Sequence, residues 1–283
     1  MPQCSKYFVF LALGIVAACG GSEEGGATGA EAVGDAGGTT AAAGNPLGLI
    51  EPGVLRLGTE PAYPPFEMKA KDGSIIGFDI EIARGFAEKH GLKLEVIASE
   101  FEGLIPELQT GRIDMIMSGM SITAERAEVV NFSKPYYEVG QVVMFRKDLE
   151  GTIKTATDLN DPKYKIAVQT ATTGYFATQK YLPKAEKLPY GSGTESAYAV
   201  LRKEADATVF DDPLIRIFAS EHPDSVTAIL KPFTEEEIGI AVNKKNPALL
   251  EAVNAYIDEL AGSDKMNDLE RDYFIMLTWK ALQ

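Results

Sequence analysis

Cysteine and histidine are nearly absent from this chain of 283 residues, which holds two of each. Both cysteines, Cys4 and Cys19, lie close to the N-terminus, so everything after Cys19 lacks disulfides, thiolate nucleophiles and cysteine-based metal sites. His90 stands at the end of a helix-like segment and His222 in a loop-like one. The sequence therefore predicts neither a Ser-His-Asp site nor a metal–histidine site, and we expect no metal and no cofactor.

Positive charge and long apolar runs are also scarce. Lys and Arg total 27 against 41 for Asp and Glu, a formal net charge of −14, and no basic block is interleaved with aromatic residues. A nucleic-acid partner is therefore not expected. No apolar run after Ala18 is long enough for a transmembrane helix. With 45% apolar and 24% charged residues, the composition is typical of one or two globular domains.

The first residues have the features of an export signal. Lys6 precedes an apolar run over 7–18, too short to span a bilayer, and small residues lead up to Cys19. This resembles the lipobox of a bacterial lipoprotein signal peptide, which implies a signal over 1–18, lipidation of Cys19 and an extracytoplasmic, membrane-anchored location in the cell envelope. The alternative is an ordinary secretory signal with a chance cysteine. Gly, Ala, Ser, Thr and Glu dominate 20–45, so we expect a flexible tether within 19–49.

The remaining chain alternates strand-like and helix-like segments in two sets. In the first set, the residue pattern predicts strands over 54–58, 92–97 and 113–117 and helices over 78–90 and 103–109. In the second set, it predicts strands over 165–168 and 207–210, a helix from 175, and helices over 197–203 and 213–220. A strand over 238–242 and two helices within 247–282 follow. The alternation predicts parallel sheets covered by helices, with a ligand site between two lobes at the carboxyl ends of the strands.

The run from Gly111 to Arg126 is the most informative segment. Its apolar strand ends in small and hydroxyl residues, namely Ser118, Gly119, Ser121 and Thr123. Thr123 has the position of an N-cap for a short helix that contains Arg126. Backbone N–H groups at a helix start and a guanidinium both suit an anion, so the run predicts a site for a small carboxylate. From spacing alone, Arg126 fits equally a surface pair with acidic neighbours on its own helix.

The motifs of the body, taken together, resemble the polar amino-acid family of bacterial extracellular solute-binding proteins. They follow the family order over about 54–279 and comprise Gly58–Glu60, Tyr63–Glu67, Gly77–Glu81, Leu104–Pro106, Ser118–Arg126, Phe132–Tyr137, Ala167–Thr173 and Asp206–Pro213. The resemblance implies an α/β fold of the type II periplasmic-binding-protein kind, with mixed sheets in two lobes and a two-strand hinge at 136–140 and 238–242. Lobe 1 would comprise 50–137 plus 241–283, and lobe 2 would comprise 138–240. Such proteins bind a free amino acid and deliver it to the permease subunits of an ABC importer.

The same resemblance implies a ligand-binding set. It consists of Glu60, Tyr63, Phe101, Ser118, Gly119, Ser121, Arg126, Gln169, Thr172, Thr173 and Asp211. Arg126 would clamp the ligand carboxylate with Gly119 and Ser121, and Thr173 would close on it from the second lobe. Asp211 would take the ammonium group, although its spacing before Pro213 also fits a helix N-cap. Tyr63 and Phe101 would sandwich the stem of the ligand.

The resemblance leaves the ligand and some site details open. Glu60 matches an acidic position of relatives that bind cationic ligands, which favours arginine, lysine, ornithine or histidine; the alternative is that Glu60 faces solvent or a hinge residue. Ala171 stands where the family commonly has glycine, and Asp212, where a hydroxyl is commoner, would add negative charge near the ammonium site. The acidic run over 235–237 is read as a solvated turn. Non-enzymatic binding is expected, with a ligand-sensing module or a cyclohexadienyl-dehydratase-like enzyme as alternatives.

Overall fold

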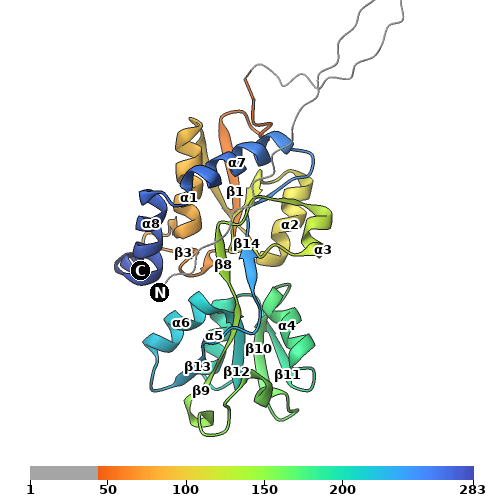
Figure 1. The fold of residues 1–283 in the computed structure, drawn as a ribbon, viewed down its shortest axis with the longest axis vertical. Coiled ribbons are helices and arrows are strands. Elements are labelled where there is room, and N and C mark those ends of the chain that lie inside the picture. The colour runs from red at the N-terminus through yellow and green to blue at the C-terminus, as the bar shows by residue number, and fades with distance from the viewer. Residues whose placement is uncertain (1–43) are drawn as a thin grey trace, which may run out of the picture. The chain divides into compact units, whose positions relative to one another are not determined.

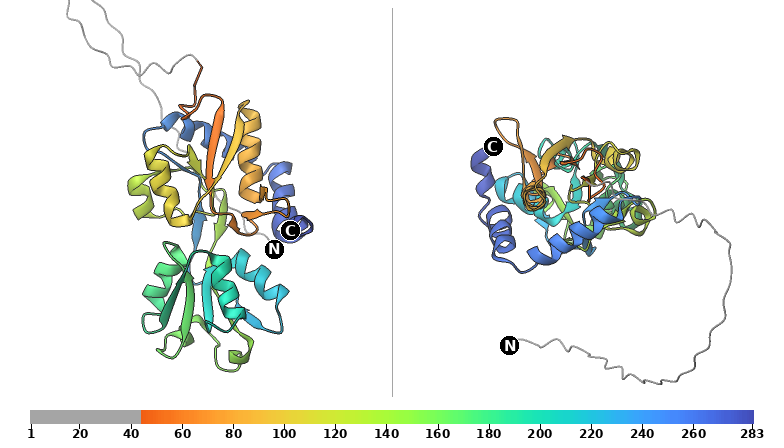
Figure 2. Two further views of the ribbon diagram at one scale, coloured as in Figure 1. Left: turned by 180° about the vertical axis from the view of Figure 1, so that it is seen from behind. Right: turned by 90° about the horizontal axis from the view of Figure 1, so that it is seen from above.

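The computed structural model describes residues 44–283, which belong to one compact unit and fold into two lobes (Figures 1 and 2). The predicted signal peptide, Cys19 and nearly all of the predicted tether lie outside the described residues. Across 44–283, no helix combines the length and the apolar character that crossing a membrane requires.

The first lobe is built on a five-stranded mixed sheet. Its strands run in the order β5 (Lys93–Ala98), β1 (Val54–Thr59), β6 (Met115–Ile116), β15 (Ala241–Val242) and β7 (Asn131–Phe132). β1 pairs in parallel with β5 and β6, whereas β15 is antiparallel to both of its neighbours. α1 (Phe78–Lys89) and α7 (Pro247–Leu260) lie on one face, and α2 (Phe101–Thr110) packs on the other (Figure 1).

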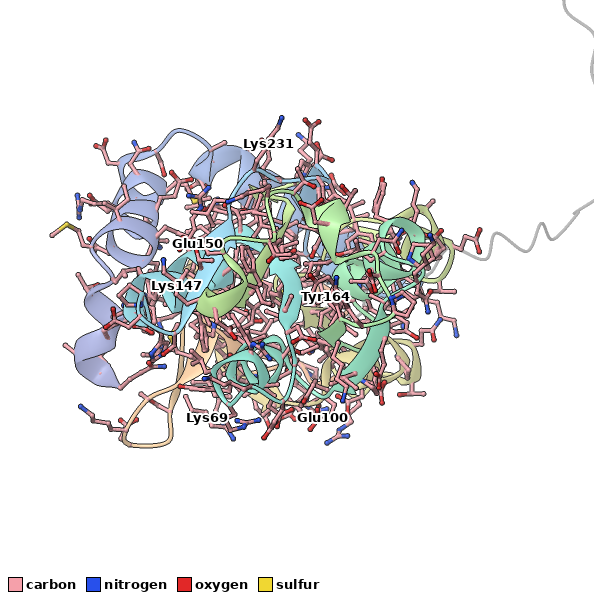
Figure 3. All side chains as sticks on the ribbon, turned by 90° about the horizontal axis from the view of Figure 1, so that it is seen from below. Lys69, Glu100, Lys147, Glu150, Tyr164 and Lys231 are labelled. Carbon is pink, nitrogen blue, oxygen red and sulfur yellow. The ribbon has the colours of Figure 1, made fainter. Side chains whose placement is uncertain are left out.

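The second lobe repeats this plan. Its sheet runs in the order β11 (Glu186–Tyr190), β10 (Lys165–Gln169), β12 (Ala207–Asp211), β9 (Gln141–Arg146) and β13 (Val226–Ile229), with β9 antiparallel to β12 and β13. α5 (Gly193–Leu201) and α6 (Asp212–Glu221) pack together on one face, and α4 (Thr173–Tyr181) covers the other. Figure 3 shows charged side chains such as Lys147, Glu150 and Lys231 projecting from the surface. Lys147 and Glu150 form an ion pair at 3.0 Å, and surface pairs of this kind contribute little to stability.

Two antiparallel strands connect the lobes. β8 (Tyr137–Val139) and β14 (Glu236–Ile238) pair with each other and run side by side between the two sheets (Figure 1). The continuous strand predicted over 238–242 is wrong, because the chain divides there into β14 in the hinge and β15 in the first lobe. Gly239 lies at the division, where a Cβ atom would approach the side chain of Ile122 to 2.8 Å.

Smaller elements complete the fold. They are β2 (Ala62–Tyr63), β3 (Glu67–Lys69), β4 (Ile75–Ile76), α3 (Ala124–Val129), α8 (Asp264–Glu270), and the short helical turns η1 (Lys147–Leu149), η2 (Ala156–Leu159), η3 (Arg271–Ile275) and η4 (Thr278–Leu282). The predicted two-lobed α/β fold is confirmed. The two five-stranded sheets are mixed, as the resemblance implied. The prediction of parallel sheets, which rested on the alternation of strands and helices alone, is therefore wrong. The helix predicted from 197 begins at Gly193, because the Ser192 hydroxyl caps it.

Candidate functional site

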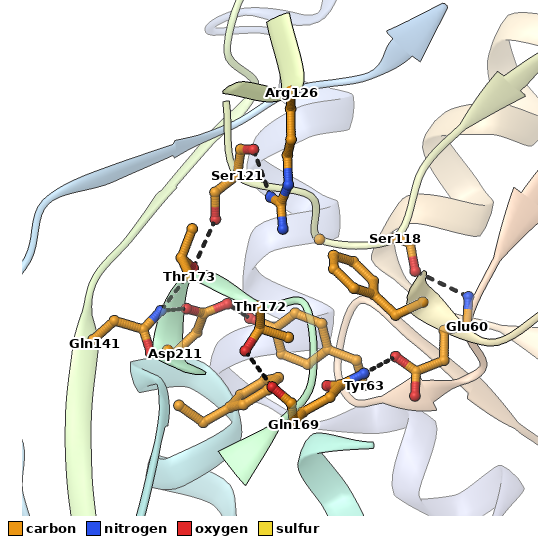
Figure 4. A pocket seen from close by; sticks show the side chains of 14 residues that line it. Glu60, Tyr63, Ser118, Ser121, Arg126, Gln141, Gln169, Thr172, Thr173 and Asp211 are labelled. Carbon is orange, nitrogen blue, oxygen red and sulfur yellow. Dashed lines mark hydrogen bonds between the residues drawn. The ribbon is translucent and has the colours of Figure 1, made fainter. Parts of the chain in front are cut away.

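A cavity lies between the lobes, where β1, β6, β10 and β12 end (Figure 4). Its lining comprises Glu60, Tyr63, Phe101, Ser118, Gly119, Ser121, Arg126, Gln141, Gln169, Thr172, Thr173, Gly174, Phe210 and Asp211. All of the predicted ligand residues are among them. The empty space, open mouth included, is about 320 Å³, but the space open to the centre of a water molecule is only about 20 Å³. The lobes are therefore closed tightly, and side chains occupy most of the site.

Arg126 provides the positive charge of the cavity. The hydroxyl of Thr123 accepts a hydrogen bond from the Arg126 backbone N–H at 3.2 Å, which confirms the predicted N-cap of α3. The guanidinium donates to the carbonyls of Ser121 at 2.7 Å and of Ala171, in the second lobe, at 3.1 Å. It lies 5.2 Å from the centre of the Phe101 ring, and burial lowers its pKa. α3 has only six residues, so the guanidinium is the main cationic feature here.

The first-lobe turn that follows β6 passes beneath the Tyr63 ring. Gly119 has a φ of 51°, and a Cβ atom there would lie 2.3 Å from Tyr63 Cε1, so both backbone and space require glycine. Its N–H donates to Asp79 at 3.0 Å. The hydroxyl of Ser118 donates to Glu67 at 3.0 Å and accepts from the Glu60 N–H at 2.9 Å. These polar groups are thus held by protein partners in the closed arrangement.

Asp211 lies at the end of β12, on the second lobe, and is buried. Tyr63 donates its phenolic hydrogen to Asp211 across the cleft at 2.6 Å, and the amide of Gln141 also donates to this carboxyl. Asp211 occupies the N-cap position of α6, as its spacing before Pro213 indicated, but its side chain makes no capping hydrogen bond and lines the cavity. Burial raises the pKa of Asp211 to about 7, and Glu236 adds to the effect. A cation at this position would restore the ionised form.

Glu60 lies at the opposite margin, after β1. It is 6% exposed, which excludes the solvent-facing alternative in the closed form. Its carboxyl accepts a hydrogen bond of 2.7 Å from the amide of Gln169 in the second lobe. Burial raises the pKa of Glu60 to about 8, and the Gln169 hydrogen bond partly opposes the shift. The cavity therefore holds two acidic groups whose charge depends on a nearby cation.

Asp212 does not join this acidic set. It is absent from the cavity lining, and its carboxyl accepts hydrogen bonds from the Arg216 guanidinium at 2.9 Å and from the Gly140 N–H at 3.4 Å. Asp212 nevertheless lies near enough for its charge to add to the raised pKa of Asp211, so the predicted extra negative charge beside Asp211 is confirmed although Asp212 does not line the cavity. Ala171 adopts a φ of 60°, the left-handed region that favours the glycine common in the family, and its carbonyl meets Arg126.

Hydroxyl and amide groups of the second lobe complete the site. Thr172 caps α4 by accepting from the Tyr175 N–H at 3.1 Å and donates to the Gln169 carbonyl at 2.8 Å. Thr173 accepts from the amide of Gln141 at 3.2 Å and lies 3.4 Å from the Ser121 hydroxyl. Thr173 therefore faces the first lobe beside Arg126.

Several lining residues were missed from the sequence. Gln141 begins β9 directly after the hinge and contacts Asp211, but a lone polar residue before an apolar strand carries no distinctive signal. Phe210 packs edge-on against Tyr63 with ring centres 5.0 Å apart, whereas Phe101 stacks beneath Arg126. The acidic run over 235–237 is not a turn: Glu236 lies in β14 and accepts from the Ser121 hydroxyl at 2.8 Å.

The buried acids predict how stability varies with pH. Burial raises the pKa of Glu60 to about 8 and of Asp211 to about 7, so the folded protein holds protons that the unfolded chain releases above about pH 4. This contribution to stability is complete below about pH 4 and is lost progressively as the pH rises to 7–8. We expect the free energy of unfolding of the ligand-free protein to fall between about pH 5 and pH 8, by up to about 1.4 kcal/mol per pH unit for each proton.

Chemical denaturation at a series of pH values checks this prediction. Exposed acids whose pKa is lowered, such as Asp148 and Asp158, titrate below this range and do not interfere. The Asp211→Asn variant should show a shallower decline. A free energy of unfolding that stays level or rises from pH 5 to pH 8 contradicts the assigned titrations.

Comparison with known proteins identifies the family. Residues 55–276 match the family described as bacterial extracellular solute-binding proteins, family 3. The chain belongs to this family. Among relatives of this family 3 protein, the L-arginine-binding protein of Pseudomonas aeruginosa is 32% identical over 235 residues, covering 78% of this chain and 87% of that protein. The L-cystine-binding protein TcyJ of Escherichia coli is 29% identical and covers 79% of this chain and 84% of its own.

Solved structures agree with the family 3 assignment. A putative binding component of an ABC transporter from Wolinella succinogenes, complexed with lysine, superposes with a TM-score of 0.77 at 33% identity, over 81% of this chain and 99% of that one. The ancestral amino acid-binding protein AncCDT-1, described as a precursor of cyclohexadienyl dehydratase, superposes with a TM-score of 0.75 at 38% identity. The match covers 78% of this chain and 96% of that one. The extracellular character of family 3 places the protein outside the cytoplasm.

Proposed function

We propose that this family 3 protein binds one free polar amino acid in the cavity between its lobes and delivers it to an ABC importer. The observation that carries the proposal is the placement of Arg126 and Asp211 on different lobes around one buried space (Figure 4). The two side chains are near enough for the Asp211 charge to influence the guanidinium. An amino acid presents the complementary pair of charges, and burial makes both contacts strong.

The site is proposed to prefer a cationic amino acid: arginine, lysine, ornithine or histidine. The support is Glu60, a second buried acid on the side away from Arg126 (Figure 4). The relative from Pseudomonas aeruginosa is named for arginine, and the solved structure from Wolinella succinogenes holds lysine. A positive side chain would ionise Glu60 and replace its contact with Gln169.

A Glu60→Gln substitution tests this preference. We expect arginine to bind about tenfold to a hundredfold more weakly, because a charged hydrogen bond worth about 1.5–3 kcal/mol is lost. Glutamine, which has no side-chain charge, should bind within about threefold of its wild-type affinity. Isothermal titration of both ligands at pH 8 measures the two changes. Equal changes for arginine and glutamine would remove Glu60 from the specificity-determining role.

The assignment as a binding protein is tested by a ligand panel. A thermal-shift screen against the twenty standard amino acids and ornithine should raise the melting temperature for a cationic subset, because a ligand that binds the native state stabilises it by mass action. If no amino acid in the panel shifts the transition, the proposed function is wrong.

We propose that the protein is not an enzyme, although AncCDT-1 is described as a precursor of a dehydratase. The carboxyl groups of Glu60 and Asp211 have pKa values near neutrality and are the groups that an acid–base reaction would need. Incubation with prephenate and with arogenate should give no turnover. Turnover of either compound would favour the enzyme, and ligand binding without uptake through a permease would favour a sensing module.

The membrane attachment and the rigid units are further parts of the proposal. The proposed anchor is a lipid on Cys19 after removal of 1–18, supported by the small residues before Cys19 and the polar tether after it. A Cys19→Ser variant should then leave the membrane fraction.

The proposed rigid units are 50–137 plus 241–283 and 138–240, with β8 and β14 as the hinge between them.

A further inference from the structure

A buried pair of carboxyl groups lies behind the cavity, within the first lobe. Glu67 is in β3 and Asp79 is in the first turn of α1, and both are 0% exposed. The chain brings them together through Gly77, where a Cβ atom would lie 2.0 Å from the Phe66 carbonyl oxygen. The Asp79 N–H donates to that carbonyl at 3.0 Å. The two acids are therefore fixed side by side by the backbone.

The partners of Asp79 are all donors. One carboxyl oxygen accepts from the Gly119 N–H at 3.0 Å, and the other accepts from the Tyr136 hydroxyl at 2.8 Å. Gly119 belongs to the turn that lines the cavity, and Tyr136 directly precedes the hinge strand β8. Asp79 thus joins the candidate ligand turn to the hinge. Because both of its oxygens receive hydrogen atoms, the arrangement suits the ionised carboxylate.

Glu67 has the complementary pattern. One carboxyl oxygen accepts from the Ser118 hydroxyl at 3.0 Å, and the other finds no donor among residues 44–283. Its remaining hydrogen-bonding neighbour is the Asp79 carboxyl, to which only a protonated Glu67 could donate. Two adjacent buried carboxylates without a cation would be costly, whereas one shared proton removes the conflict.

We propose that this pair holds a single proton on Glu67, and that the Asp79 carboxylate positions the Ser118–Gly119 turn and ties it to the hinge at Tyr136. The part that concerns ligand affinity rests on the proposed amino-acid binding. The titratable groups that face the pair are Glu60, Tyr63 and Tyr136. Burial raises the pKa of both acids, which agrees with the shared proton.

The assignment predicts opposite results for two isosteric substitutions. In Glu67→Gln, the amide N–H can donate to Asp79 while the amide oxygen still accepts from Ser118, so arginine affinity should stay within about threefold. In Asp79→Asn, the amide oxygen can accept from the Gly119 N–H only if the NH₂ group faces Tyr136, whose hydroxyl must then turn and accept, so both charged hydrogen bonds of the carboxylate are lost. Arginine should then bind about tenfold to a hundredfold more weakly, as expected for the loss of a charged hydrogen bond. The reverse order of effects would overturn the proposal.

Two readouts separate positioning from general loss of stability. Arginine affinity, titrated calorimetrically from pH 7 to pH 10 on folded samples, should decline more steeply in wild type than in Glu67→Gln, because only wild type loses the shared proton. Infrared spectroscopy of the ligand-free protein at pH 9 should show a protonated-carboxyl carbonyl band that persists in Glu60→Gln and disappears in Glu67→Gln. Identical pH profiles, or a band that survives Glu67→Gln, would refute the shared proton. If the band behaves as expected but no amino acid binds wild type, the proposed function fails while the protonated pair stands.

Discussion

An Arg126→Ala variant is expected to bind its amino acid about two to four orders of magnitude more weakly than wild type. The guanidinium is held in place by the carbonyls of Ser121 and Ala171 and by the Phe101 ring, so it is oriented before a ligand arrives. Its removal would leave the carboxylate of the bound amino acid desolvated and unpaired. Breaking a buried charge pair from one side costs about 3–5 kcal/mol, which corresponds to the stated loss of affinity.

Isothermal titration measures this loss of affinity, and two further variants serve for comparison. Arg112→Ala is the matched control, because Arg112 is exposed and pairs with Glu107 at 2.7 Å on the surface. Its affinity should equal that of wild type. Arg126→Lys should fall between wild type and alanine, since it keeps the charge but loses the planar, two-pronged donor. An Arg126→Ala affinity within about threefold of wild type would exclude the guanidinium as the carboxylate clamp.

An Asp211→Ala variant is expected to show a loss of similar size, again about two to four orders of magnitude. Here the unpaired group would be the ammonium of the amino acid, enclosed by Tyr63 and Phe210. Ligand binding should also be accompanied by a release of protons. Because burial raises the pKa of Asp211 to about 7, wild type should release protons at pH 7 when an ammonium group arrives and lowers that pKa.

Calorimetry in two buffers of different ionisation enthalpy measures the released protons. Asp211→Asn should release fewer than wild type with the same ligand. Asp212→Asn is the neighbouring comparison, because Asp212 pairs with Arg216, does not line the cavity and makes only a minor contribution to the raised pKa of Asp211. It should keep nearly the affinity of wild type and should change the proton release less than Asp211→Asn does. If Asp212→Asn and Asp211→Asn have equal effects, the ammonium position has been assigned to the wrong acid.

Local signals in the sequence predicted much of the first lobe. Thr123 before a short acidic turn predicted the cap of α3, and Gly91 after an amphipathic run predicted the end of α1. All the site residues predicted from the motif order line the cavity, because the carboxyl ends of strands in both sheets converge there, whereas the lining residues Gln141 and Phe210 were not predicted.

Long-range pairing explains what the sequence did not reveal. The division of 238–242 depends on β14 pairing with β8 and β15 pairing with β6, and neither partner is close in sequence. Gln141 contacts Asp211 because β9 pairs with β12 in a register that sets these two residues opposite each other. Glu236 looked solvated because its neighbours are acidic, yet a hinge strand brings it to Ser121. Pairing across the sheet outweighs local composition at each of these positions.

A crystal structure of the protein grown with the amino acid that stabilises it most is the most direct test of the whole account. It should show the ligand between the lobes, with its carboxylate on Arg126 and its ammonium group on Asp211. A ligand bound elsewhere, or one held by neither of these side chains, would contradict the account.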